Sequence, residues 1–529
     1  MKVAIIGAGP CGLTSIKCCL DEGLEPVCFE KGTDLGGLWR FTTTEPDHAS
    51  VYKACVMVTS KEMSCFSDFP IPKGYPLYLP HDLAKAYLNQ YADNFDLRPY
   101  ISYNSKVLKV THSQKANKNH WKITYEQRKI HDDSTESTET FTQVFDAVLV
   151  CSGHHWEANI PELPGADKFH GEIMHSSSFK EAKHFYGKNV LVVGIGDSAL
   201  AIATELSQVV KKVYLSTRRG SWITSRIQAF GMPSDQFLHR RFFFNLPRRL
   251  LDTACMNLVN LKFDHGDFGL LPNNTFLQQP PVVNDFLPYK VISGAVLMRP
   301  DISTLTDKDV IFVDGSVALD VDVIILATGY NYSFPFLDED MVEFKHKSPL
   351  MYKHMFRVEE NPSIAFIGCL QPVGCMFSVA ELQARLATRV FKGLVKLPST
   401  EDMEQDIAEN LARLENESYD AKKHATAVYY IPYCNSLAEI IGCKPRLGAM
   451  LLTDPHLALR CYFGPCSPPQ YRLRGPGAWS GARRAIMEIQ ERNIAQMKKE
   501  VPGTNYVKLI ITIVAGLLFL YFMLTHILY

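Results

Sequence analysis

The sequence lacks an excess of charge of either sign, because its 529 residues include 55 lysines and arginines against 56 aspartates and glutamates. This balance predicts no nucleic-acid partner, since such a partner usually requires a basic surface. Its 14 cysteines lack the spacing of metal ligands, which predicts no metal site and reduced thiols on the cytosolic side. The apolar pattern at 2–6 leaves no room for a cleavable signal peptide.

Two glycine-rich turns, 187 residues apart, dominate what the sequence does contain. Each directly follows a short apolar run, as in the strand–turn–helix unit that binds dinucleotides. The backbone N–H groups at the start of such a helix face the pyrophosphate. In the first turn we expect cofactor contacts from Gly7, Ala8, Gly9, Pro10, Cys11 and Gly12. In the second we expect them from Gly194, Gly196, Ser198, Ala199, Leu200 and Ala201.

The residues at the end of the following strand indicate which nucleotide each turn binds. Glu30 lies 23 residues after Gly7, where a carboxylate accepts hydrogen bonds from ribose and repels a 2′-phosphate. The first turn therefore suits FAD or NAD. Arg218 and Arg219 stand at the corresponding place after the second turn, where guanidinium groups suit the 2′-phosphate of NADPH. A solvated basic pair is the alternative.

The C-terminus contains a long apolar run. Residues 509–529 hold a single ionisable side chain, His526, and are long enough to span roughly 30 Å of hydrocarbon as a helix. Lysines at 498, 499 and 508 suit a cytosolic flank. We therefore expect a transmembrane anchor at 507–529 that binds membrane lipid; a helix lying on the membrane surface is the alternative.

The pattern between these landmarks predicts an α/β fold with two Rossmann-like dinucleotide-binding domains, one inserted in the other. Two similar apolar segments, 145–153 and 321–329, are the expected crossings between them. The predicted parts are an FAD domain at 1–154 and 330–440, an NADPH domain at 155–329, a C-terminal region at 441–506 and the anchor. An aromatic-rich insertion at about 221–300 folds either over the active site or against the membrane.

Residues 169–179 read FHGEIMHSSSF, which matches the F-x-G-x-x-x-H-x-x-x-[YF] signature of the flavin-containing monooxygenases. The chain resembles a vertebrate microsomal member of that family almost from end to end. Four further stretches occur in the family's order: EKGTDLGGLWRF at 30–41, SKEMSCFSDFP at 60–70, CSGHH at 151–155 and ATGY at 327–330. Even within this signature, His175 is better interpreted as a packing residue than as a proton donor.

The resemblance implies an endoplasmic reticulum membrane enzyme with its catalytic body in the cytosol and with FAD and NADPH as cofactors. NADPH would reduce the flavin, which would add O₂ to form a C4a-hydroperoxide that oxygenates a nucleophilic nitrogen or sulfur atom of a small molecule. Such a site needs few catalytic side chains, since its main task is to exclude water. The resemblance places Gly37, Leu38 and Trp39 along the flavin. It also brings Gln371 to the cofactors from the strand that closes the FAD domain.

One departure concerns the flavin site. The family usually has asparagine where this chain has Val58, directly before Thr59. Loss of a preorganised donor at a reactive centre costs about 2.7–4 kcal/mol. One hypothesis is that NADPH oxidation is uncoupled and releases H₂O₂; the alternative is that Thr59, NADP⁺ or water supplies the contact. A second departure is Asp197 in place of asparagine, for which we expect a helix N-cap role, with weaker NADPH binding as the alternative.

Three other functions are alternatives to a coupled monooxygenase. An NADPH oxidase, a ketone-oxygenating member and a catalytically weak membrane flavoprotein are the alternatives, and the intact glycines, Glu30 and the two arginines disfavour the last. A dithiol reductase is excluded because residues 36–51 contain no cysteine. The sequence leaves open the substrate and the oligomeric state, including a homo-oligomer.

Overall fold

The computed structural model describes residues 1–45, 48–115, 118–130, 136–228, 231–345, 348–417 and 426–497. Its first sheet has five parallel strands in the order β22-β7-β1-β2-β3. These strands are β1 (Lys2–Ile6), β2 (Glu25–Phe29), β3 (Ile101–Ser102), β7 (Ala147–Val150) and β22 (Ile364–Phe366). Their apolar runs are buried, as expected for parallel strands that are covered on both faces.

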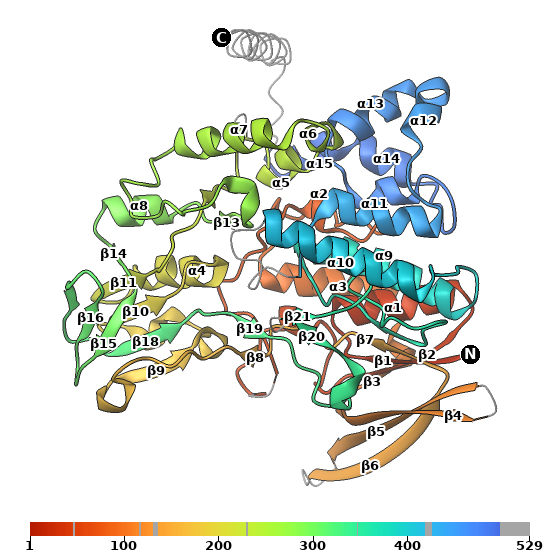
Figure 1. The fold of residues 1–529 in the computed structure, drawn as a ribbon, viewed down its shortest axis with the longest axis horizontal. Helices are drawn as coiled ribbons and strands as arrows, with labels where there is room; N and C mark the ends of the chain where they lie inside the picture. The colour runs from red at the N-terminus through yellow and green to blue at the C-terminus, as the bar shows by residue number, and fades with distance from the viewer. Residues whose placement is uncertain are drawn as a thin grey trace.

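A second five-stranded parallel sheet lies beside the first in Figure 1 and has the order β14-β11-β10-β18-β9. Its strands are β9 (Glu172–His175), β10 (Asn189–Val193), β11 (Lys212–Ser216), β14 (Val296–Arg299) and β18 (Val323–Leu326). The two sheets confirm the predicted α/β fold. The chain leaves the first sheet after β7 and returns to it at β22, while the domain boundaries given above stay a prediction.

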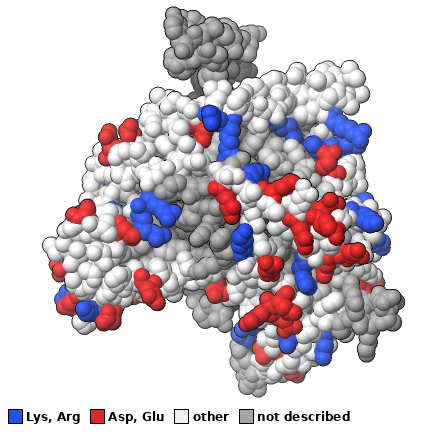
Figure 2. Space-filling view, in the orientation of Figure 1, with Lys and Arg blue, Asp and Glu red and all other residues white. Residues whose placement is uncertain are grey.

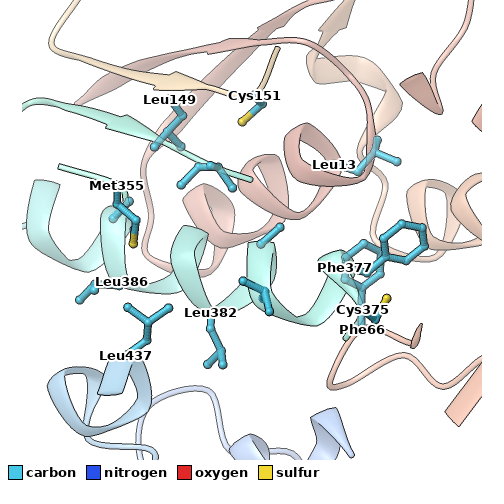
Figure 3. Packing of buried hydrophobic residues seen from close by; sticks show 14 of the residues in the cluster. Leu13, Phe66, Leu149, Cys151, Met355, Cys375, Phe377, Leu382, Leu386 and Leu437 are labelled. Carbon is cyan, nitrogen blue, oxygen red and sulfur yellow. The ribbon is translucent and has the colours of Figure 1, made fainter. Parts of the chain in front are cut away.

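The largest hydrophobic core surrounds α9 (Met376–Phe391), which packs against α1 (Pro10–Asp21). Figure 3 shows Leu13 of α1 and Leu382 and Leu386 of α9 in this core, together with Leu149 of β7. Leu437 reaches the same core from α11 (Tyr430–Ile441). α1 and α9, which begin 366 residues apart in the chain, are therefore parts of one core with the first sheet.

Smaller elements surround the two sheets. A three-stranded antiparallel sheet is formed by β4 (Ser105–Lys115), β5 (Lys118–Ile130) and β6 (Glu136–Phe145). The predicted insertion forms α5 (Ser234–Leu238), α6 (Arg241–Phe244), α7 (Arg248–Asn260) and α8 (Leu287–Ile292). The C-terminal region adds α12 (Leu447–Thr453), α13 (Pro455–Phe463), α14 (Ala482–Met487) and α15 (Ile489–Ile494). In Figure 1, α5, α6 and α15 lie together in the upper part of the molecule.

No helix within the described ranges is both long and apolar enough to cross a membrane. The predicted anchor at 507–529 lies outside those ranges, since the described chain ends at residue 497. All 14 cysteines are described and none is in a disulfide. Burial raises the pKa of most of these thiols, for example that of Cys18 to about 12.

Candidate functional site

The first glycine-rich turn connects β1 to α1 at the carboxyl end of the first sheet. Gly7 N–H donates to Phe29 O at 2.8 Å, which joins the turn to the end of β2. A Cβ atom at Gly12 would lie 1.8 Å from Gly7 O, so only glycine allows the helix to approach the turn this closely. The turn can therefore present the start of α1 to a pyrophosphate.

Glu30 lies beside this turn, as predicted. Its side chain is buried, with 4% of the residue exposed. One carboxylate oxygen accepts a hydrogen bond from Ala8 N at 2.7 Å and the other from Gly32 N at 2.8 Å. Each oxygen keeps a further lone pair, which can accept from a ribose hydroxyl. The carboxylate thus fits a nucleotide without a 2′-phosphate.

A second glycine-rich loop covers the first turn. Gly36 N–H donates to Ala8 O at 2.9 Å, and a Cβ atom at Gly37 would lie 2.9 Å from the Cα atom of Gly9. The short 3₁₀ helix η1 (Gly37–Trp39) follows. The indole ring of Trp39 packs edge-on against Phe377 of α9, with 6.3 Å between ring centroids. The structure therefore places Gly37, Leu38 and Trp39 next to the first nucleotide turn.

The second glycine-rich turn connects β10 to α4 (Asp197–Leu206) and is more open. Gly194 has φ 130°, and a Cβ atom there would lie 2.4 Å from Ala327 O. Gly196 precedes α4, and a Cβ atom there would meet no atom within 4 Å. Ser198 is exposed, whereas Ala199 and Leu200 are buried under the helix and Ala201 is half-buried. The open space at the start of α4 fits a pyrophosphate.

Arg218 and Arg219 follow β11 and line a hollow of about 360 Å³. The same hollow is lined by a third arginine, Arg299, which sequence reasoning missed. Arg299 ends β14 and lies opposite Ser216 in the strand pairing, and its guanidinium lies 5.5 Å from the ring centroid of Tyr214. The only sequence signal was an arginine at the end of an apolar run. In Figure 2 a group of basic side chains lies over the second sheet.

The N-cap role expected for Asp197 is wrong. Gly196 is the N-cap, and Asp197 is the first residue of α4. Its carboxylate accepts a hydrogen bond from Val283 N at 2.9 Å instead. The reason is the insertion, whose short strand β13 (Val282–Val283) presents an N–H group to the start of the helix.

The segment that contains Val58 and Thr59 lies between the two nucleotide turns in sequence and leads into α2 (Lys61–Ser64). Both residues are half-buried. Met57 N–H donates to Leu79 O at 2.8 Å, and the hydroxyl groups of Thr59 and Ser64 share a hydrogen bond of 2.8 Å. Thr59 therefore already uses part of its hydrogen-bonding capacity, and Val58 has none in its side chain.

Gln371 does not lie on a strand of the first sheet, contrary to expectation. That sheet is closed by β22, and Gln371 begins the next strand, β23 (Gln371–Val373), which pairs in parallel with β24 (Ala427–Tyr429). Its side chain is exposed, and its backbone N–H donates to Thr426 O at 2.9 Å. The chain bends away from the sheet after β22, at Gly368 with φ 78°, so Gln371 follows the closing strand instead of lying on it.

His175 ends β9 and contacts the end of one predicted crossing segment, 321–329. Its Nε2 atom lies 3.0 Å from Gly329 O, and its Nδ1 atom accepts from Ser177 N at 3.1 Å. Burial lowers the pKa of His175, which favours the neutral ring that accepts this hydrogen bond. These contacts are those of a packing residue.

Comparison with known proteins places these features in a family. The profile described as flavin-binding monooxygenase-like matches residues 1–529. The chain is 43% identical to dimethylaniline monooxygenase [N-oxide-forming] 2 of Cavia porcellus over 94% of this chain and 93% of that protein. It is 41% identical to flavin-containing monooxygenase 2 of Homo sapiens, with the same coverage of both chains.

The fold also resembles solved structures. S-allyl-L-cysteine S-oxygenase from Allium sativum superposes with a TM-score of 0.62 at 22% identity, over 93% of this chain and 98% of that one. An open structure of cyclohexanone monooxygenase gives a TM-score of 0.59 at 16% identity, over 83% and 97%. At these identities the likeness concerns the fold alone.

Proposed function

The chain belongs to the flavin-binding monooxygenase family, and from that premise we propose that it uses NADPH and O₂ to oxygenate soft nitrogen or sulfur nucleophiles in small molecules. It is a flavin-dependent enzyme with FAD and NADP as cofactors. The observation that carries the proposal is the contrast in charge at the two nucleotide turns. A carboxylate, Glu30, lies at the first, and three arginines line the hollow beside the second.

The residues present fit both cofactors. Glu30 would hold the ribose of FAD, and the N–H groups at the start of α1 would hold its pyrophosphate. Arg218, Arg219 and Arg299 would hold the 2′-phosphate of NADPH. When bound, reduced FAD supplies the electrons that activate O₂. The protein's task is then to position the two rings and to exclude water.

The names of similar proteins support nitrogen and sulfur as the atoms that are oxygenated. Several curated relatives are named as N-oxide-forming dimethylaniline monooxygenases, and one structural neighbour is named as an S-oxygenase. The insertion lies over the segment that contains Val58, since Arg226 Nε donates to Met57 O at 3.4 Å and Asp235 accepts from Ser60 N at 2.6 Å. These contacts favour a role for the insertion as a cover of the active site.

The test is a mass balance on the FAD-loaded full chain with NADPH and O₂. N,N-dimethylaniline and methyl phenyl sulfide are supplied as probes, and NADPH consumed, H₂O₂ released and N-oxide or sulfoxide formed are measured. We expect the oxygenated product to account for most of the NADPH. NADPH consumption with neither product above background would overturn the proposal.

A second candidate function is an NADPH oxidase that releases H₂O₂. The observation that favours it is Val58, whose half-buried side chain offers no hydrogen bond beside Thr59. The same mass balance separates the two functions, because an oxidase releases one H₂O₂ for each NADPH. Rapid mixing of the NADPH-reduced protein with O₂ adds a direct reading: immediate return to oxidised flavin supports the oxidase.

We also propose that the chain is anchored in the endoplasmic reticulum membrane by 507–529, with its catalytic body in the cytosol. The proposal is supported by the apolar run at 509–529 and the lysines before it. Carbonate extraction of microsomes that contain the full chain is the test. We expect the protein to stay in the membrane pellet, and its release into the supernatant would overturn the proposal.

A further inference from the structure

The last described helix, α15, is joined to the segment that contains Val58 and Thr59. Arg492 Nε lies 3.0 Å from each carboxylate oxygen of Glu62 in α2, and Arg492 also donates to Ile71 O. The side chains of Arg492 and Glu62 are 12% and 5% exposed. This ion pair is therefore largely shielded from water. Its carboxylate, Glu62, lies three residues after Thr59 in the sequence.

A second connection runs through α5 of the insertion. The side-chain amides of Asn493 and Gln236 bond reciprocally, at 2.7 and 3.1 Å, and Gln236 also donates to Ser60 Oγ at 3.0 Å. Gln236 is only 2% exposed. Its neighbour Asp235 accepts from Ser60 N at 2.6 Å. Ser60, the residue after Thr59, is thus held at its backbone and at its hydroxyl by a helix that α15 supports.

A third connection holds the far end of the same segment. Arg472 Nε donates to Ser67 Oγ at 2.6 Å, and its Nη2 atom lies 2.9 Å from Asp68 and 2.5 Å from Glu381 of α9. Arg472 and Arg492 both belong to the C-terminal region. Residues 60–68 are therefore held at each end by an arginine that comes from more than 400 positions later in the chain.

The charges of Glu62 and Arg492 indicate that their contact positions α2 relative to α15. Burial raises the pKa of Glu62, and Arg492 opposes this by favouring the charged carboxylate. A buried ion pair adds little net stability relative to apolar side chains, but removal of one partner leaves an uncompensated charge. Here the geometry of the pair, with Arg492 Nε at 3.0 Å from both oxygens of Glu62, links one arrangement of α15 and α2 to a paired charge.

We propose that α15 is a positioning element for the active site: Arg492 and Asn493 hold residues 58–64 in the arrangement that the oxygenation reaction needs. This inference rests on the proposed function, with Val58 and Thr59 at the flavin as the family resemblance implies. In the described structure no hydrogen bond or ion pair links Arg492 or Asn493 to those two residues, so both act through Glu62, Gln236 and Ser60. A displacement of 1 Å at a reacting centre can cost about a hundredfold in rate.

The test compares Arg492→Met with a matched control, Arg483→Met, in the FAD-loaded full chain. Arg483 also lies in the C-terminal region and pairs with Asp454 at 2.6 Å, but its side chain is 56% exposed and it contacts no residue of 57–69 in the described structure. Three quantities are measured: hydrogen exchange of peptides that cover 57–69, visible circular dichroism of bound FAD, and H₂O₂ released per NADPH.

We expect Arg492→Met to accelerate exchange in 57–69 by about tenfold, which corresponds to about 1.4 kcal/mol, while peptides from β10 exchange as before. The FAD circular dichroism changes, and H₂O₂ released per NADPH rises. Arg483→Met leaves all three unchanged. Arg492→Lys keeps the charge, so all three quantities should lie between those of Arg492→Met and the unaltered protein. Asn493→Ala should shift all three in the same direction as Arg492→Met but by less, because it leaves no charge unpaired.

Two results would overturn the proposal: unchanged exchange in 57–69, or faster exchange with unchanged FAD circular dichroism and unchanged H₂O₂ release. If Arg492→Met does not fold, Asn493→Ala decides by the same measurements. Failure of the proposed function looks different, because the unaltered enzyme then releases one H₂O₂ per NADPH and forms no product. Exchange and circular dichroism still test the positioning role in that case.

Discussion

The two glycine-rich turns have the same strand–turn–helix plan but opposite surroundings. The first is enclosed. A Cβ atom added at Gly12 or Gly37 would lie within 3 Å of the backbone of the turn, and the buried carboxylate of Glu30 accepts hydrogen bonds from two backbone N–H groups. The second is open, since Gly196 faces empty space and Arg218 and Arg219 are exposed. An enclosed turn suits a cofactor that stays bound, and an open turn suits a coenzyme that is exchanged.

The largest effect is expected when a methyl group is added to the first turn, compared with the same addition to the second. Gly12→Ala places a Cβ atom 1.8 Å from Gly7 O and should destabilise the protein by about 3 kcal/mol, with loss of FAD. Gly196→Ala meets no atom and should cost less than about 1 kcal/mol. Thermal unfolding and the ratio of flavin to protein absorbance measure both. Equal effects of the two changes would remove the distinction between an enclosed and an open turn.

A smaller effect is expected from Glu30→Gln, which preserves size but removes the charge. The new amide group cannot accept from both Ala8 N and Gly32 N, and it binds ribose hydroxyls less strongly. We expect FAD affinity to fall by about 1.5–3 kcal/mol, as for hydrogen bonds to charged groups. Titration of the apoprotein with FAD gives this value. The KM for NADPH should stay as it is, and a change in that constant alone would contradict the assignment.

Arg218→Ala tests the opposite side of the comparison. Loss of one guanidinium group from the hollow beside β11 should raise the KM for NADPH by about tenfold, with FAD content unchanged. NADH lacks the 2′-phosphate, so its KM should not move. Arg299→Ala should act in the same direction, which assigns the arginine of β14 to the same phosphate. A parallel rise for NADH would mean that these arginines do not recognise the 2′-phosphate.

The smallest change concerns the segment that leads from the first turn to α2. Val58→Asn adds a donor and an acceptor where the side chain now has neither. A hydrogen bond introduced into a site that is not arranged for it is worth about 0.5–1.5 kcal/mol, less than the roughly 2.7–4 kcal/mol of a preorganised donor. We expect more oxygenated product for each NADPH consumed, with FAD content unchanged. Val58→Ala is the control, because it alters size without adding a polar group. An unchanged product ratio in Val58→Asn would reject the uncoupling hypothesis.

Local patterns account for most of what could be predicted. Apolar runs followed by glycine located the strands β1 and β10 and the helices α1 and α4, because this turn depends on a few consecutive residues. The positions of Glu30 and the two arginines followed from the length of one βαβ unit. Gln371 was assigned to the strand that closes the FAD domain, but it begins the next strand, β23. Gly368, with φ 78°, lies between the two strands, and this local signal of a bend was missed.

By itself, then, the sequence determined the α/β class, the two nucleotide turns and the charge that each presents, because these depend on neighbours within about 30 residues. Only the tertiary structure decided which distant side chains meet there. It brought Arg299 to the hollow beside Arg218, turned Asp197 toward the insertion, and paired Glu62 with Arg492 across 430 positions. Such pairs depend on the packing of whole elements, and no local spacing encodes that packing.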